Sequence, residues 1–123
     1  MVDEGEPSGE LLAEISNSIV GILREYYGPG PTKAKTYIFD DYVLTVLQDI
    51  LTTVERTLVE RGHQDLVRQV RVTFQGAVAD RFKTAVADAT GRRVIAYHSQ
   101  VTFQPDMGFE VFVLEPEADD EDS

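Results

Sequence analysis

The stretch "YYGPGPTKAKTYIFDDYVLTVL", residues 26–47, decides how the fold is interpreted. Its GPGPTK segment has the glycines, lysine and threonine of a phosphate-binding loop. Such a loop follows a strand and precedes a helix. Here an apolar-periodic helix pattern comes first and a strand pattern follows, while Pro29 and Pro31 remove two amide donors. We therefore interpret GPGPTK as a helix stop and a rigid approach to a strand, in which Lys33 and Lys35 could still attract an anion.

Upstream of this loop, the sequence predicts a helix over residues 10–27. One apolar stripe runs along it at spacings of three and four: Leu11, Ile15, Ile19, Ile22 and Tyr26. Ser8 is the expected N-cap, and Gly28 is expected to close the helix in the left-handed conformation.

Downstream, residues 34–39 and 42–49 alternate as strands do, with Asp40-Asp41 as the turn of a hairpin. Asp40-Asp41 could also serve as a paired acid, but a tight turn is the better use of two aspartates. Thr52 and Glu55 then form a capping box. It predicts a short helix that ends at Gly62, with Val54 and Leu58 facing inward.

A longer helix is predicted over residues 65–90, closed by Gly91. Its expected buried stripe is Val67, Val70, Phe74, Val78, Phe82, Ala85 and Ala89. Two final strands, 93–103 and 109–114, flank a turn at 104–108. We expect an α+β fold: an N-terminal helix, a hairpin, two helices and a C-terminal hairpin, with helices packed on a four-stranded antiparallel sheet.

The last strand, residues 109–114, is apolar on both alternating faces. A strand of this kind requires cover on both sides of its sheet. Helices can cover one side, and a second copy of the chain is the natural cover for the other. The sequence therefore predicts a homodimer.

The acidic charge is concentrated at the two ends of the chain. The 123 residues carry a net charge of −11, with four acids in residues 1–10, six in residues 115–123, and no base in either segment. We expect disordered tails at 1–9 and 117–123 around one domain at 10–116. Such tails repel a phosphate backbone, which argues against nucleic acid as a partner.

The residues that usually carry catalysis are sparse. The chain has no cysteine and only two histidines, His63 and His98, which lie 35 residues apart without a neighbouring carboxylate pattern. Neither a metal site nor a nucleophile with its base is apparent. We therefore expect no enzymatic activity, no cofactor and no bound metal.

Arg71 is the candidate binding residue of the long helix. At about 100° per residue it lies about 40° from Val67, within the apolar stripe, and Arg81 falls on the stripe's other margin. A guanidinium placed there must reach solvent or find an anion. Its partner is an internal carboxylate (Asp40, Asp49 or Glu55), the acidic surface of another protein, or a bound small anion. A bound anion would make Lys33, Lys35 and Arg71 a ligand-binding set.

Nearly the whole body of the chain resembles a known family. The resemblance runs through residues 14–116, with "GPGPTK", "LTTVERTLVERG" and "LVRQVR" as its distinctive blocks. These are similar to the MpsC (YbcI-like) family, small proteins named after a Na+-translocating, membrane-potential-generating system. No catalytic residues are established for this family, so the resemblance implies none here. The acidic tails depart from its pattern.

The resemblance implies a non-enzymatic accessory or regulatory subunit of a membrane system for cation or inorganic-carbon transport. Its partner would be a membrane transport protein of that system. No apolar run approaches the ~20 residues that span a bilayer, and the N-terminus lacks a signal peptide. We therefore expect a soluble, cytoplasmic chain that reaches the membrane through its partner. The alternative function is a small-anion or metabolite-binding domain.

Overall fold

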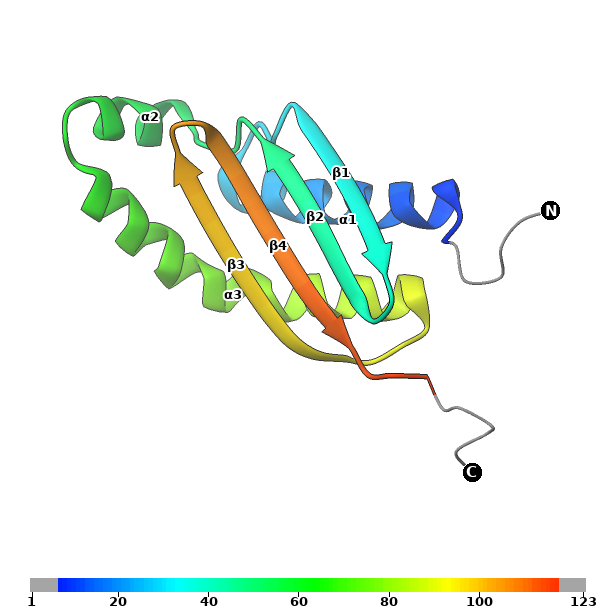
Figure 1. The fold of residues 1–123 in the computed structure, drawn as a ribbon. Helices are drawn as coiled ribbons and strands as arrows, with labels where there is room; N and C mark the ends of the chain where they lie inside the picture. The colour runs from blue at the N-terminus through cyan, green and yellow to red at the C-terminus, as the bar shows by residue number, and fades with distance from the viewer. Residues whose placement is uncertain (1–6, 118–123) are drawn as a thin grey trace.

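The computed structural model describes residues 7–117 and contains three helices and one four-stranded sheet (Figure 1). The elements are α1 (Gly9–Tyr27), β1 (Lys33–Phe39), β2 (Tyr42–Gln48), α2 (Thr53–Glu60), α3 (Gln64–Thr90), β3 (Val94–Phe103) and β4 (Asp106–Leu114). Figure 1 shows α1 and α3 on one side of the sheet, with α2 beyond its end. The predicted α+β class and element order are confirmed.

Both hairpins join into one antiparallel sheet with the strand order β1-β2-β4-β3. The pairing of β2 with β4 runs from Tyr42 opposite Val113 to Gln48 opposite Met107. The last strand therefore becomes a central strand, flanked by β2 and β3. Asp40 takes a positive φ of 54° in the two-residue turn of the first hairpin, as the predicted aspartate turn requires.

Alternation along the strands separates an inner face, under the helices, from an outer face. The core on the inner side consists of Ile15, Ile19, Ile22 and Leu23 from α1, Val43 and Leu47 from β2, Val78, Phe82 and Val86 from α3, and Phe112 and Leu114 from β4. The outer face carries the opposite residues of each strand and meets no helix. Buried Phe112 thus points inward, and half-buried Phe109 points outward.

The caps at the helix ends follow the sequence closely. Ser8 accepts a hydrogen bond from the amide of Leu11, and both bonds of the Thr52–Glu55 capping box are present. Gly91 closes α3 in the left-handed conformation. Gly28 also has a positive φ, 86°, but its ψ of −141° lies outside the left-handed helical region, so that part of the prediction is wrong.

A chain of buried hydroxyls ties α1 to the sheet. Ser16 Oγ lies 2.7 Å from Thr36 Oγ1, which lies 2.9 Å from Thr45 Oγ1, and all three residues are buried. The chain links α1, β1 and β2 in turn. Because each hydroxyl has a partner, these polar groups lie in the core without an unsatisfied atom.

The GPGPTK loop connects a helix to a strand, as predicted. The Thr32 amide donates to the carbonyl of Gln48, which extends the β1–β2 pairing by one residue. Gly30 approaches Arg24 so closely that an added Cβ would lie 2.9 Å from the Arg24 Cγ. The loop backbone is therefore committed to strand pairing and helix packing.

Four positions of the predicted apolar stripes are exposed instead. In α1, Tyr26 is 36% exposed, while its neighbour Tyr27 is half-buried. Val54 is 69% exposed, Val70 is 38% exposed and Phe74 is 42% exposed. The predicted buried stripe of α3 is correct for the C-terminal half of the helix, which packs on the sheet and on α1. Its N-terminal half is covered by α2 and the end of α1, so a different side of the helix is buried there.

The second hairpin is tighter than predicted. β4 begins at Asp106, so only Gln104 and Pro105 separate the strands, and residues 106–108 belong to β4 rather than to the turn.

No helix among residues 7–117 combines the length and the apolar character needed to cross a membrane. The predicted disorder of the acidic tails concerns mainly residues 1–6 and 118–123, which lie outside the described residues.

Candidate functional site

A buried ion pair joins α2 to α3. Arg71 Nε donates to Glu55 Oε2 at 2.7 Å, and Arg71 Nη2 donates to Glu55 Oε1 at 2.6 Å. The two side chains are only 10% and 9% exposed. This two-pronged geometry is the strongest form of an arginine–carboxylate contact. Of the predicted partners of Arg71, the structure selects the internal carboxylate Glu55.

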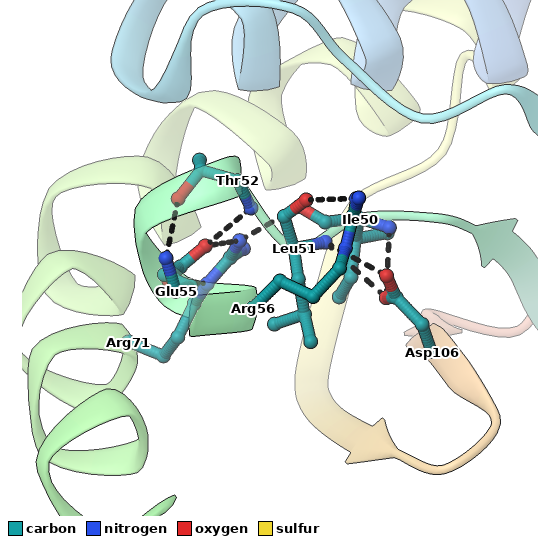
Figure 2. A network of polar contacts seen from close by, with 7 residues as sticks. All are labelled: Ile50, Leu51, Thr52, Glu55, Arg56, Arg71 and Asp106. Atoms are coloured by element: carbon teal, nitrogen blue, oxygen red, sulfur yellow. Dashed lines mark hydrogen bonds and ion pairs between the residues drawn. The ribbon is translucent and has the colours of Figure 1, made fainter. Parts of the chain in front are cut away.

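The pair is the centre of a wider polar network (Figure 2). Arg71 Nη2 also donates to the carbonyl of Ile50 at 2.8 Å, and the Asp106 carboxylate accepts from the amides of Ile50 (2.9 Å) and Leu51 (3.2 Å). Arg56 donates to the Leu51 carbonyl from the other side. The network therefore fastens the β2–α2 connection to the β3–β4 hairpin and to α3.

The capping box explains why Glu55 is available to Arg71. Glu55 Oε1 accepts from the amide of Thr52 at 2.9 Å, which holds the carboxylate at the buried end of α2. Burial would raise the pKa of the Glu55 carboxyl, but the hydrogen bonds from Arg71 and Thr52 and the charge of Arg71 outweigh it. The pKa of Glu55 therefore lies below its usual value and the pair is ionised at neutral pH.

Tyr27, the last residue of α1, packs against the guanidinium of Arg71. Its ring centroid lies 4.0 Å from the Arg71 Cζ, a cation–π contact. Burial raises the pKa of the Tyr27 hydroxyl. Arg71 is thus enclosed by an aromatic ring, a carboxylate and a carbonyl, and all three helices contribute to its surroundings.

A small cavity lies between this arginine and the inner face of the sheet. About 40 Å³ is available to the centres of water molecules, so the cavity has room for water, and it is partly open to solvent. Its polar lining consists of Tyr27, Arg71, Gln75, Tyr97, Ser99 and Glu110. The remaining walls are apolar: Leu23, Leu47, Ile50, Val78, Phe82 and Val101.

Glu110 is the acid of this cavity, and it is 5% exposed. Its carboxylate accepts hydrogen bonds from Tyr97 Oη at 2.5 Å and Ser99 Oγ at 3.0 Å. Burial raises the pKa of Glu110 to about 7, although the two hydrogen bonds and the charge of Arg71 oppose the rise. Burial and the neighbouring Glu110 also raise the pKa of Tyr97. Glu110 therefore exchanges a proton near neutral pH.

The three predicted ligand residues do not converge. Lys33 and Lys35 share the alternation of exposed Tyr37, so they lie on the outer face of β1, while Thr36 points inward to α1. Arg71 lies on the inner side of the sheet. Arg81, the other arginine of the predicted stripe, is a surface residue paired with Glu25.

Sequence reasoning did not identify Glu110, Tyr97 or Ser99. The available signal was a single acid between Phe109 and Val111 in an otherwise apolar strand. Tyr97 and Ser99 are two residues apart in one strand and therefore point to the same face, but they belong to no recognisable sequence motif. His63 and His98 are exposed, and no group of three or more His, Cys, Asp or Glu among the described residues is arranged to hold a metal ion.

We expect Arg71→Met to lower the stability sharply. The substitution leaves the Glu55 carboxylate buried without its cation, and breaking a buried pair in this way costs roughly 3–5 kcal/mol. Chemical denaturation measures the loss, and added bicarbonate or phosphate should not change it.

The double variant Arg71→Met/Glu55→Gln is the control for this interpretation. Glutamine keeps the capping box but carries no charge, so the double variant should be more stable than Arg71→Met alone. A double variant no more stable than the single one would show that the buried charge is not the cause of the loss.

A second prediction concerns pH. The pKa of Glu110 lies above the ordinary 4.5 at about 7, so the native state holds a proton that the unfolded chain releases. Stability should therefore fall as the pH rises from about 4.5 to about 7 and stay level above that range. At about 1.4 kcal/mol per pH unit the loss is on the order of 3 kcal/mol. Glu110→Gln should remove this slope, while Glu14→Gln, at an exposed position of α1, should retain it in denaturation series from pH 4.5 to 8.

Comparison with known proteins identifies the family. No curated protein and no solved structure matches the chain significantly. One family model does match, over residues 7–116, which includes all the elements described above. Its description is "Na+-translocating membrane potential-generating system (MpsC)". The chain therefore belongs to the MpsC family.

Proposed function

We propose that this chain is a non-enzymatic accessory or regulatory subunit of a Na+-translocating, membrane-potential-generating system. It would act on the cytoplasmic side, bound to a membrane transport protein of that system. The family match over residues 7–116 carries the proposal, because it connects the whole described domain with such a system. A compact domain with an open sheet face is consistent with a subunit that works by contact with other proteins.

The open outer face of the sheet is the surface that we assign to self-association. Exposed aromatic residues lie along its β1–β2 edge, with Tyr37 42%, Phe39 55% and Tyr42 46% exposed. Its two central strands contribute further half-buried apolar side chains: Leu44, Val46, Phe109, Val111 and Val113. None of the outward-facing residues of the paired strands is Asp or Glu, in a chain of net charge −11. A second copy could therefore cover this face without burying a carboxylate.

The size of this face suits a homodimer. Seven paired residues at about 3.4 Å and four strands at about 4.8 Å give a plan area of about 450 Å². Because side chains project from this plane, the accessible area of the face is larger than its plan area. It is therefore closer to the ~800 Å² that each partner contributes to a standard interface. Lys33 and Lys35 lie on an edge strand, so they can remain at the solvated rim.

The small-anion alternative has less support. Glu55 already occupies two nitrogens of Arg71, and the nearby cavity is lined by the Glu110 carboxylate, which repels an anion. The two lysines lie on the other face of the sheet. A single anion therefore cannot use all three predicted cations.

The accessory role predicts that Na+-dependent membrane potential requires this chain. In membrane vesicles from source cells that lack it, a potential-sensitive dye should report a reduced response to Na+. Added purified chain should restore the response and saturate at a fixed ratio to vesicle protein, as a bound subunit does. An unchanged response in vesicles without the chain would refute the proposal.

The homodimer predicts a dimer mass by light scattering at micromolar concentration. Phe109→Glu places a charge on the outer face and should give a folded monomer. Val72→Glu places the same charge on an exposed position of α3 (69% exposed) and should remain dimeric. Phe112→Glu, which faces the core, should unfold the chain. A strictly monomeric mass for the unmodified protein would exclude self-association at this concentration.

A further inference from the structure

The charges around the interior cavity do not balance. From α3 and α2, Arg71 and Glu55 neutralise each other through two hydrogen bonds. From β4, Glu110 adds a second acid. The ion pairs formed among residues 7–117 do not include Glu110. When Glu110 is ionised, the cavity holds one net negative charge.

The neighbours of Glu110 supply no further cation. β3 presents the hydroxyls of Tyr97 and Ser99, and β2 places Thr45 opposite Glu110 in the ladder. The end of α1 contributes Tyr27. The hydrogen-bond partners of Glu110 are all neutral, and the nearby cation Arg71 is already paired with Glu55. A buried carboxylate in this position favours taking up a proton or acquiring a further positive charge from a ligand.

The cavity offers oxygen atoms and room for such a ligand. The carboxylate and the hydroxyls of Tyr97 and Ser99 are already joined by hydrogen bonds, and the Gln75 amide lines the same space. Oxygen ligands are those that hard cations prefer. The cavity also admits water-sized groups, so a metal ion could keep water ligands there.

We propose that this cavity binds one monovalent metal cation, for which Na+ is the probe, held by the Glu110 carboxylate and the hydroxyls of Tyr97 and Ser99. The ion exchanges with the carboxyl proton: one Na+ enters as one H+ leaves, and the net charge of the cavity is zero in both states. A divalent ion would leave one uncompensated positive charge in the cavity. A monovalent ion is therefore favoured, because it neutralises the single negative charge. The proposal concerns this chain alone and does not depend on the membrane role.

Competition between Na+ and the proton gives the test. In the intact chain, ¹³C NMR of the glutamate carboxyls follows the protonation of Glu110, assigned by its absence in Glu110→Gln. Above the dissociation constant, each tenfold increase in NaCl should lower the apparent pKa of Glu110 by about one pH unit. Choline chloride at the same ionic strength should leave that pKa in place.

Thermal denaturation supplies an independent readout. At pH 8, NaCl should raise the melting temperature more than choline chloride does. The difference should vanish at pH 5, where Glu110 is protonated, and in Glu110→Gln at either pH. Tyr97→Phe keeps the charge but removes one oxygen, so it should weaken the Na+ response without abolishing it. Glu14→Gln should respond like the unmodified chain.

Three outcomes would overturn the proposal. Equal effects of NaCl and choline chloride would show only ionic screening. A Na+ response that persists in Glu110→Gln would place the ion elsewhere. A larger response to MgCl₂ than to NaCl at equal ionic strength would contradict the charge count.

Discussion

The Arg71–Glu55 pair is the interaction on which the arrangement of the helices depends. α2 is a single short helix, and its predicted inward residue Val54 is exposed. Its attachment therefore relies on Glu55, which caps the helix and binds Arg71 at once. The same guanidinium holds the carbonyl of Ile50 and stacks on Tyr27. One side chain thus connects the start of α2, the end of α1 and the β2–α2 connection.

This arrangement also defines the cavity. Arg71 is held between Glu55 and Tyr27 and leaves a small space above the inner face of the sheet, where Glu110 lies. Glu110 accepts hydrogen bonds only from hydroxyls, and burial raises its pKa to about 7, although the charge of Arg71 opposes the rise. Arg71 therefore contributes both to the packing of the helices, through Glu55, and to the electrostatic surroundings of Glu110.

The two faces of the sheet have different roles in this account. The inner face joins the core and contains the acid that exchanges a proton. The outer face is apolar over its two central strands and carries no carboxylate on its paired strands, and we assign it to a second copy of the chain. Glu110 and its neighbours Phe109 and Val111 belong to the same central strand, so the strand contacts the cavity on one side and the proposed dimer interface on the other. Cavity and interface are then separated by the thickness of one sheet.

The sequence by itself determined the elements and their class. Helix and strand patterns have different periods, and caps such as Ser8 and the Thr52–Glu55 box act within a few residues, so local information suffices for them. It also indicated that Arg71 needs an anion. The sequence could not determine which side of each half of α3 is covered, because burial depends on neighbours from other segments. For this reason it wrongly predicted that Val70 and Phe74 are buried. Nor could it find the cavity: Tyr27, Arg71, Tyr97 and Glu110 come from four elements, and only the strand order β1-β2-β4-β3 and the packing of the helices bring them together. A pKa near 7 is a property of that assembled, desolvated environment and of no residue alone.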